Sequence, residues 1–396
     1  MPQTIELEEY QTRRIPRARM TDQIGELLFR TYGTQVIVEF PSPKTNFEWE
    51  LTPQGWVGQV PITSDLALVL EPKTPIGNLF RMLEYAYRLK SFSFPDGLVA
   101  TDSLEDLYEQ LADILARRVL DRARLGFYRA YIGRAERLSH ISGRIDLRQM
   151  ARRPWAVDVP CQYQEHTADI DDNQILAWTL GVILRSGVCS DRTQPTVRKA
   201  YRTLQTAAAP VAFSAQDCVR RPYNRLNDDY RPMHALSRFF LEHSGPSHKI
   251  GDRTMVPFLV NMARLYELFV AEWLQAHLPA GYQLKAQEHI TVDGVTGLSV
   301  NIDLTLNETA SGRTLCVLDT KYKVHAGPAT DDISQVVAYA DLKGTREAVL
   351  VYPVPLQYPL DIPWGAKHVR SMTFSIDGDL EVVGRRFLDI LLDAVA

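Results

Sequence analysis

Apolar and polar residues alternate in short runs along the first hundred residues, and Pro and Gly separate these runs. Three runs show the alternation, at residues 34–39, 55–61 and 66–70. A period of two residues is typical of half-buried β-strands. The apolar spacing changes to three and four residues over 75–89 and 103–120, which predicts helices, and Ser103 is a suitable N-cap for the second.

Helical spacing continues through the middle of the chain, over residues 171–184, 196–208 and 231–243. The last third alternates between helical and strand patterns. A long amphipathic helix is predicted over 257–278, with Tyr266, Phe269 and Trp273 along one side. The elements after it are predicted as strands over 283–291, 298–306 and 313–323, a helix over 331–341, strands over 347–352 and 368–374, and a helix over 383–395. This order favours helices layered on a sheet.

Together the patterns predict a multi-domain α+β protein with three segments. Residues 1–155 are predicted to form an N-terminal domain that is β-rich, then helical, and ends in an arginine-rich stretch. Residues 156–250 are predicted to be a helical linker region, and residues 251–396 a C-terminal α/β domain. A chain of 396 residues is long enough for each segment to bury a core of its own.

Composition places the chain among ordinary globular proteins. Hydrophobic residues make up 45% and charged residues 23%. The longest nonpolar stretch, residues 175–184, is short and is interrupted by Thr179, whereas a membrane span needs about 20 apolar residues. The acidic N-terminal residues do not resemble a secretory signal. We therefore expect a cytoplasmic protein that has no contact with membranes.

Four widely separated cysteines give no metal or disulfide pattern. They are Cys161, Cys189, Cys218 and Cys316. No CxxC pair occurs, which argues against a zinc knuckle, and four cysteines in a chain of this length are not a disulfide scaffold. We expect four reduced thiols.

Residues 116–155 differ from the rest of the chain in charge. This stretch holds eleven arginines and no lysine, and its local balance is +8 in a chain whose net charge is −4. Such a surface binds phosphates or an acidic partner. A solvated helix face followed by a basic loop explains the same pattern, and the sequence leaves both interpretations open.

Two predicted strands carry charged residues that suggest catalysis. In the strand over 298–306, Asp303 alternates with apolar neighbours and points away from the apolar face. The strand over 313–323 is apolar on both faces, as a central strand is, and leads into Asp319 and Lys321, which are two apart and share a face. The two carboxylates are candidate ligands of Mg²⁺ or Mn²⁺, and Lys321 is a candidate to orient water or stabilise charge on a phosphate. The alternative is a salt bridge between Asp319 and Lys321 at a sheet edge.

Three residues on helices complete the candidate set. Gln335 and Tyr339 are four apart in the predicted helix over 331–341 and share a face. Glu267 lies on the long helix beside its apolar stripe and is a third candidate metal ligand. A solvated helix face is the alternative for Glu267. The full order is a helix Glu, a strand Asp, a strand Asp-x-Lys and a helix Gln-x-x-x-Tyr.

This order resembles the PD-(D/E)xK nuclease superfamily. Asp303 and residues 319–321 (Asp-Thr-Lys) correspond to its core, and Gln335 with Tyr339 resembles the QxxxY element of RecB-type nucleases. The sequence departs from the pattern at Asn301-Ile302-Asp303, where Pro-Asp is usual, but that proline is not a metal ligand. Lys323 is a second candidate for the lysine. The chain as a whole is similar to the McrC family through the segments SGRIDL at 142–147, EHT at 165–167, DNQIL at 172–176, YELFV at 266–270 and LDTKYK at 318–323. A structural alternative for two of these segments is that Gly143 forms a turn and that Asp172 and Asn173 cap the helix that follows.

The resemblance implies the nuclease subunit of a McrBC-type, modification-dependent restriction system. It implies a C-terminal PD-(D/E)xK domain that cleaves double-stranded, modified DNA with Mg²⁺, in which Asp303, Asp319 and Glu267 hold the metal. It also implies an McrB-like AAA+ GTPase hexamer as partner, whose NTPase the N-terminal half stimulates. The chain has no GxxxxGK[ST] loop, so we expect it to bind no nucleotide itself. The arginine-rich stretch is our candidate for part of the partner contact.

Two other functions stay open. A stand-alone RecB-like nuclease would carry the same core, and many such enzymes hold an iron–sulfur cluster on four cysteines. The cysteines here lie in the wrong places, because three are far upstream and Cys316 lies inside a strand. A non-catalytic adaptor would regulate a partner NTPase through a decayed nuclease domain. Retention of both aspartates, the lysine, Gln335 and Tyr339 argues against decay.

Overall fold

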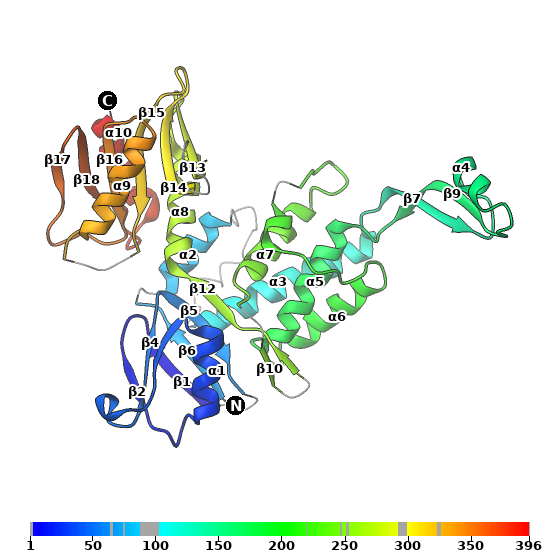
Figure 1. The fold of residues 1–396 in the computed structure, drawn as a ribbon, viewed down its shortest axis with the longest axis horizontal. Helices are drawn as coiled ribbons and strands as arrows, with labels where there is room; N and C mark the ends of the chain where they lie inside the picture. The colour runs from blue at the N-terminus through cyan, green and yellow to red at the C-terminus, as the bar shows by residue number, and fades with distance from the viewer. Residues whose placement is uncertain are drawn as a thin grey trace. The chain divides into compact units, whose positions relative to one another are not determined.

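The computed structural model describes residues 3–63, 66–73, 76–87, 103–219, 221–245, 248–250, 253–291, 299–322 and 326–395. It is a mixed structure of helices and several sheets, which confirms the α+β class (Figure 1). The chain divides into two compact units, one made of Met1–Leu107 with Pro257–Ala396 and the other of Tyr108–Val256. The two ends of the chain therefore share one unit. The three-segment division predicted from the sequence stays a prediction about functional domains.

The N-terminal part of the first unit contains two small sheets. One has the order β1-β6-β5-β12 and consists of β1 (Gln3–Glu8), β6 (Leu66–Glu71), β5 (Trp56–Pro61) and β12 (Phe258–Asn261). The other has the order β2-β4-β3 and consists of β2 (Arg13–Ile15), β4 (Trp49–Pro53) and β3 (Val36–Glu39). Helix α1 (Asp22–Tyr32) packs closely, because the Trp49 ring fills the space that a Cβ at Gly25 would need. Their apolar faces form one core.

Strand β12 corrects the predicted helix over 257–278. Phe258–Asn261 pairs antiparallel with β5, and helix α8 (Met262–His277) begins only after it. The Asn261 side chain caps that helix by accepting from the backbone amide of Arg264 at 3.0 Å. The first residues of the predicted helix are fully apolar, so their spacing fits a buried strand as well as a helix. The predicted stripe of Tyr266, Phe269 and Trp273 is buried.

A six-stranded sheet forms the C-terminal part of the first unit. Its order is β13-β14-β15-β16-β18-β17. The strands are β13 (Tyr282–Thr291), β14 (Ser299–Glu308), β15 (Thr314–Thr320), β16 (Glu347–Tyr352), β18 (Lys367–Thr373) and β17 (Asp361–Trp364). Strands β14 and β15 are antiparallel, whereas β15, β16 and β18 run parallel. The predicted central position of the strand that contains Asp319 is therefore confirmed.

Helices cover this sheet and join it to its neighbours. Helix α9 (Thr330–Leu342) is the crossover between parallel strands β15 and β16, and its apolar face packs on the sheet. Helix α8 packs against α10 (Leu380–Val395) and α2 (Ile76–Ala86). A Cβ atom at Gly384 would lie only 2.3 Å from the nearest atom of the Trp273 ring. The close approach of α10 to α8 therefore requires glycine at this position. None of the helices that the structure describes is long and apolar enough to span a bilayer.

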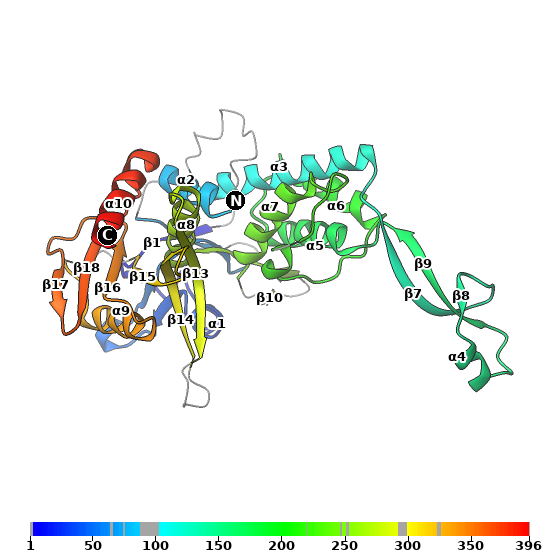
Figure 2. The same cartoon turned by 90° about the horizontal axis from the view of Figure 1, so that it is seen from above.

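The second unit combines a group of helices with a projecting ribbon (Figures 1 and 2). The helices are α3 (Leu104–Leu125), α5 (Asp171–Ser186), α6 (Gln194–Gln205) and α7 (Tyr230–Glu242). The Ser103 hydroxyl accepts from the backbone amide of Asp106 at 3.1 Å, which confirms the predicted cap of α3. A short hairpin of β10 (His248–Ile250) and β11 (Arg253–Met255) belongs to the same unit.

The ribbon, residues 130–167, is called the arm below. It contains β7 (Ala130–Leu138), β8 (Arg144–Ile145), helix α4 (Leu147–Arg152) and β9 (Val159–Thr167), in the sheet order β7-β9-β8. The middle region predicted to be helical from residue 156 thus begins with a strand. This prediction was wrong because neither long strand of the arm carries an apolar face along its whole length that would have marked it as a strand.

Candidate active site

The candidate site lies at the carboxyl end of the central strand β15. Asp319 is 2% exposed in this strand, and Lys321 follows directly after its last residue. The Lys321 backbone amide donates to the carbonyl of Val351 at 2.9 Å, which holds it along the neighbouring β16. The Lys321 Nζ lies 2.8 Å from Oδ2 of Asp319 and 3.4 Å from Oδ1 of Asp332. The side chains that the strand spacing placed on one face are thus in contact.

Asp303 reaches the same end of β15 from the adjacent strand β14. Its Oδ2 accepts two hydrogen bonds from Thr320, one from the backbone amide at 3.0 Å and one from the hydroxyl at 3.1 Å. The flanking Ile302 and Leu304 are fully buried whereas Asp303 is half-buried, so the expected difference between the two faces is present at this point of β14. Asp303 and Asp319 therefore belong to one polar cluster at the edge of the core.

Glu267 approaches the cluster from helix α8. It is half-buried rather than on a solvated face, and its Oε1 accepts a hydrogen bond from the Gln287 side chain. Gln287 lies on β13, between residues paired with Ile302 and Leu304 of β14, and therefore opposite Asp303. The backbone φ angle of Gln287 is +54°, a left-handed conformation that is unfavourable for residues other than glycine.

Gln335 and Tyr339 lie on the crossover helix α9 and extend the cluster. Lys321 Nζ donates to Oε1 of Gln335 at 2.9 Å, and Nε2 of Gln335 donates to the Tyr339 hydroxyl at 2.6 Å. Tyr339 is 7% exposed. The spacing of four residues thus joins Tyr339 to Gln335, and Gln335 contacts Lys321.

Negative charge is concentrated in this cluster. Burial, followed by the neighbouring Asp303, raises the pKa of Glu267 to about 7. The same two causes raise the pKa of Asp319 to about 7, although Lys321 acts in the opposite direction. Burial disfavours the charged form of Lys321, but Asp319, Asp332 and Asp303 outweigh it and raise the pKa of Lys321. Lys321 is therefore a cation held among carboxyl groups that repel one another.

The donor set fits a hard cation only in part. Among the described residues, no group of three or more His, Cys, Asp or Glu side chains comes close enough to enclose an ion. Asp303 and Asp319 nevertheless offer oxygen ligands, and the pKa of Asp319 is raised by burial and then by the charge of Asp303, both of which a divalent cation would offset. Mg²⁺ takes few protein carboxylates and keeps several waters, so two carboxylates are sufficient as protein ligands. Glu267 is a third oxygen donor, and after burial the charge of Asp303 is the next largest cause of its raised pKa.

Three residues of this cluster were not predicted from the sequence. Asp332 is 5% exposed and contacts Lys321, Thr320 fixes Asp303, and Gln287 contacts Glu267. Asp332 precedes Gln335 by three residues on α9, so helical spacing could have found it. Gln287 is separated from Glu267 by 20 residues, and no local pattern joins them. Lys323, the second candidate lysine, lies outside the described residues.

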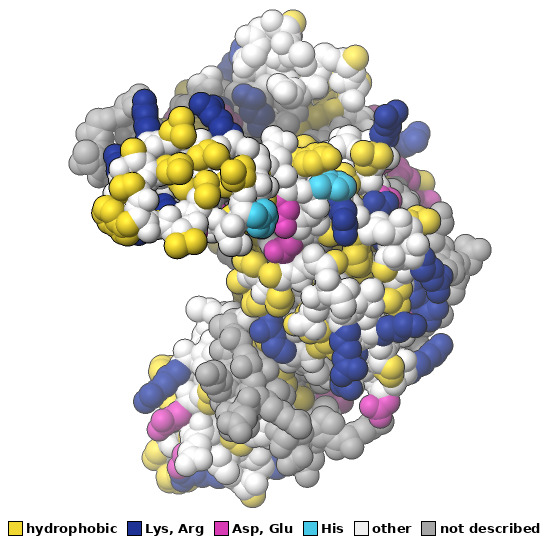
Figure 3. All heavy atoms as spheres, turned by 90° about the vertical axis from the view of Figure 1, so that its right-hand side faces the viewer, with side chains coloured by type: hydrophobic (Ala, Val, Ile, Leu, Met, Phe, Trp, Pro, Cys, Tyr) yellow, Lys and Arg dark blue, Asp and Glu magenta, His cyan; other side chains and the backbone are white. Residues whose placement is uncertain are grey.

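The arginine-rich stretch is divided between α3 and the arm. Five of its arginines pair with acids: Arg117 with Asp113, Arg122 with Asp229, Arg124 with Asp121, Arg134 with Glu165 and Arg137 with Asp158. Arg144, Arg148, Arg152 and Arg153 are exposed on β8, α4 and the residue after it. Exposed apolar side chains occur beside them: Ile141, Leu147, Met150, Trp155 and Val157. Figure 3 shows hydrophobic side chains gathered on the end of the arm that faces the viewer.

Comparisons with known proteins agree on one family. A family model described as the McrBC 5-methylcytosine restriction system component matches residues 51–353. No curated protein sequence matches the chain at a significant level. A solved chain from the half-complex of a tetradecameric assembly of Thermococcus gammatolerans McrB AAA+ hexamers with bound McrC is 16% identical, with a TM-score of 0.56 over 98% of this chain and 100% of that chain. A chain of the T. gammatolerans McrBC complex is also 16% identical, with a TM-score of 0.42 over 69% of this chain and 87% of that one.

The family model covers well over half of the sequence, including the segments on which the resemblance to McrC depends. The expected family relationship is therefore confirmed. The chain belongs to the family of McrBC 5-methylcytosine restriction system components.

Proposed function

We propose that this chain is the Mg²⁺-dependent endodeoxyribonuclease subunit of a McrBC-like restriction system. The observation that carries the proposal is the contact of Lys321 with Asp319 at the end of β15, beside an Asp303 that is anchored on Thr320. The six-stranded mixed sheet with helix α9 as crossover supports a PD-(D/E)xK domain. Family membership supports the biological context.

The side chains have separate roles in hydrolysis of a phosphodiester. Asp303 and Asp319 would hold the metal ion, with Glu267 as a third oxygen donor that supports it, and the ion would supply polarisation of the phosphate and activation of water. Lys321 stays protonated because three carboxyl groups raise its pKa. Its ammonium group is held by Asp319 and Gln335, so it is placed to stabilise the negative charge that develops on the phosphate. Gln335 and Tyr339 offer hydrogen-bonding groups to the DNA backbone.

The partner proposal follows from a solved relative of the same fold. That structure contains McrB AAA+ hexamers with bound McrC. We infer that this chain, in the cytoplasm, assembles with an McrB-like AAA+ GTPase hexamer, stimulates its NTPase and cuts modified double-stranded DNA. The end of the arm offers arginines without acid partners among the described residues, at Arg144, Arg148 and Arg152, beside exposed apolar side chains. Such a mixed surface suits a protein partner better than a phosphate backbone alone, because hydrophobic contact adds to charge.

A cleavage assay tests the proposal directly. The chain is mixed with Mg²⁺, GTP and methylated or unmethylated plasmid, with and without the AAA+ protein encoded beside it. We expect cutting of methylated plasmid only with partner and nucleotide, and loss of cutting in Lys321→Ala. Lys343→Ala is the matched control, because Lys343, which directly follows α9, also forms a partly buried ion pair, with Glu288 at 2.8 Å, but outside the cluster.

Three outcomes would contradict the proposal. Cutting by the chain alone would make it a stand-alone nuclease. Faster NTP hydrolysis by the partner with no cutting of any methylated substrate would make it a regulatory adaptor. Equal loss in Lys321→Ala and Lys343→Ala would show that the first variant acts by disturbing the sheet.

A further inference from the structure

The arm has almost no core with which to fix its own direction. Of residues 130–167, all of which the structure describes, only Pro160 and Cys161 are buried. The ribbon is held internally by its strand pairing, by ion pairs such as Arg134 with Glu165 at 3.0 Å, and by a ring stack of Tyr131 on His166. A ribbon of this kind can be straight yet free to pivot, so its orientation depends on the two points where the chain enters and leaves it.

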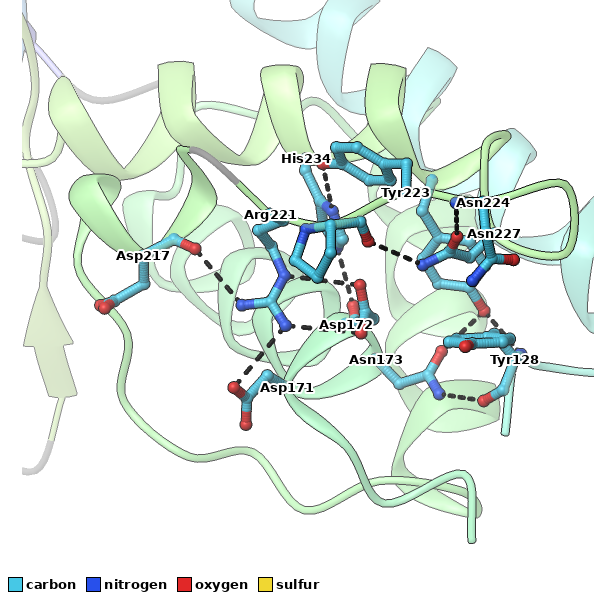
Figure 4. A network of polar contacts seen from close by, with 12 residues as sticks. Tyr128, Asp171, Asp172, Asn173, Asp217, Arg221, Tyr223, Asn224, Asn227 and His234 are labelled. Atoms are coloured by element: carbon cyan, nitrogen blue, oxygen red, sulfur yellow. Dashed lines mark hydrogen bonds and ion pairs between the residues drawn. The ribbon is translucent and has the colours of Figure 1, made fainter. Parts of the chain in front are cut away.

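One buried side chain contacts both of these points. Asn173, in the first turn of α5, is fully buried. Its Nδ2 donates to the carbonyl of Tyr128, two residues before β7, at 2.9 Å, and to the carbonyl of Ala168, directly after β9, at 2.7 Å. Figure 4 shows Asn173 and Tyr128 together at this junction. Both N–H groups of the Asn173 side chain are thus used to join the segments that enter and leave the arm to the helices.

Tyr230 completes the junction from α7. Its buried hydroxyl donates to Oδ1 of Asn173 at 2.7 Å and accepts from the backbone amide of Tyr128 at 2.9 Å. The backbone amide and carbonyl of Tyr128 are therefore both bound, one by Tyr230 and one by Asn173. A closed set of hydrogen bonds links the arm, α5 and α7 in a site away from water, where such bonds are strong and costly to break.

A second layer of contacts holds the first turn of α5 itself. The ring of His234 on α7 lies 3.0 Å from the backbone oxygen of Asp172, and its other nitrogen lies 2.9 Å from the Tyr223 hydroxyl. Arg221 lies 3.4 Å from the Asp172 carboxylate. These contacts, drawn in Figure 4, keep Asn173 in place without touching the arm.

This network corrects the interpretation of the DNQIL segment. Asp172 and Asn173 were expected to cap the following helix, but its N-cap is Ile170 and no side chain caps it. The two polar side chains are turned to tertiary partners instead. Asn173 meets Tyr128, 45 residues away, and Tyr230, 57 residues away. A capping role would require neither contact.

We infer that Asn173, with Tyr230, is a positioning residue that fixes the orientation of the arm and transmits force or binding at its end to the helices. An amide is required at this position, because two carbonyl oxygens need two N–H donors while the Tyr230 hydroxyl needs an acceptor. The fixed orientation of the arm is inferred from the geometry of this chain alone. Transmission to the helices rests on the proposed function, in which the end of the arm contacts the partner.

The orientation is measured on the isolated chain with two spin labels, at Gln149→Cys on α4 and Arg202→Cys on α6. Both positions are exposed, whereas the four native cysteines are buried and label poorly. Asn173→Asp keeps the shape and the acceptor for Tyr230 but places a carboxylate against two carbonyls. We expect a single narrow distance distribution in the parent and one roughly twofold broader in this variant, because the junction opens locally. Tyr230→Phe, which removes one hydroxyl, is expected to broaden it less.

Asn227→Asp is the matched control. Asn227 is 2% exposed in the same unit, and its amide donates only to Pro222, at 3.3 Å, away from the arm. We expect the parent distribution in this control. Equal widths in the parent, Asn173→Asp and Tyr230→Phe would overturn the inference, as would equal broadening in the control.

The same variants, without labels, are then tested for stimulation of the partner NTPase. We expect Asn173→Asp to bind the partner but to lose most of the stimulation, while Asn227→Asp retains it. A broad distribution combined with full stimulation would reject the transmission part alone. A parent chain that never stimulates any partner would reject the proposed function and leave the distance result standing.

Discussion

Thr320 donates twice to a single carboxylate oxygen of Asp303, from its backbone amide at 3.0 Å and from its hydroxyl at 3.1 Å. These two hydrogen bonds join the end of β15 to β14 beyond the last paired residues of the two strands, Leu318 and Leu304. It therefore fixes a carboxylate at the place where the regular ladder stops. Hydrogen bonds to a charged acceptor are among the stronger ones in proteins, so Thr320 sets the direction in which Asp303 presents its other oxygen.

Removing only the hydroxyl of Thr320 tests this role. Thr320→Val keeps the shape of the side chain and the backbone bond to Asp303. We expect cleavage with partner, GTP and Mg²⁺ to fall about tenfold or more, as loss of one charge-assisted hydrogen bond implies, and the Mg²⁺ concentration for half-maximal rate to rise. Thr320→Ser retains the hydroxyl and is expected to cleave like the parent. An unchanged Mg²⁺ requirement in Thr320→Val would show that Asp303 is held adequately by the backbone alone.

The raised pKa values of the cluster predict that metal affinity depends on pH. Burial and Asp303 raise the pKa of both Glu267 and Asp319 to about 7, so these groups bind protons at pH 6 and lose them by pH 8. A metal ion competes with those protons, and its affinity therefore rises with pH. We expect Mn²⁺ binding, measured by the paramagnetic resonance of free Mn²⁺, to tighten by about tenfold or more between pH 6 and 8.

Glu267→Gln should weaken Mn²⁺ binding at pH 8 and make its pH dependence shallower, because one of the competing protons is gone. Glu288→Gln is the control, since Glu288 is also a carboxylate next to β14 but pairs with Lys343. A Glu267→Gln chain with the same slope as the parent would exclude Glu267 from the metal site.

The spacing of residues along single strands and helices was sufficient to predict the contacts at the centre of the candidate site. The contact of Lys321 with Asp319 follows from the two-residue period of a strand, and the contact of Gln335 with Tyr339 follows from one helical turn. The position of β15 inside the sheet was also predictable, because its residues are apolar on both faces. In each case the relevant partners are neighbours in sequence or are fixed by the period of one element.

Contacts between distant segments were not predictable in this way. Neither long strand of the arm carries an apolar face along its whole length, so β7 and β9 were missed. The polar Asn173 fitted a helix cap before its partners at Tyr128 and Tyr230 were known. The strand β12 was missed because four apolar residues before α8 fit either structure. What the sequence lacked in each case was the identity of a partner many residues away.

The exposed arginines of the arm are expected to act in partner binding. Replacing Arg144, Arg148 and Arg152 together by Ser removes three charges that have no acid partner among the described residues. We expect partner affinity to fall by about tenfold or more, with the strongest effect at low salt, because exposed charges act mainly through screened attraction. Stimulation of NTP hydrolysis and partner-dependent cleavage should fall with it.

A matched triple variant on α6 and the loop before it controls for charge alone. Arg192, Arg198 and Arg202 are exposed in the same unit, and their replacement by Ser changes the net charge equally. Partner binding should then resemble that of the parent. If the arm variant leaves assembly, stimulation and DNA binding all unchanged, the arginines of the arm are only a solvated surface.

His234 predicts a loss of stability in acid that is confined to the second unit. Burial lowers the pKa of His234 from 6.5 to about 4. Between these values the unfolded chain binds more protons than the folded chain, so stability increases with pH in this window and is lost as the pH falls from 6.5 towards 4. The resulting loss in the free energy of unfolding is on the order of 3 kcal/mol when the pH is low enough to protonate His234 in both the folded and the unfolded chain. Hydrogen exchange of α5 and α7, corrected for the intrinsic pH dependence of exchange, should show faster opening at pH 5 than at pH 7.5.

His234→Gln separates this titration from the packing of the ring. The amide cannot bind a proton in this range, so the variant should be less stable than the parent at pH 7.5, by about 1 kcal/mol for an imperfect hydrogen bond, but should lose less stability on acidification. The difference between parent and variant should therefore shrink as the pH falls. An equal loss of protection in both chains between pH 7.5 and 5 would assign the acid sensitivity to other groups, since the ring of His234 could not then be its source.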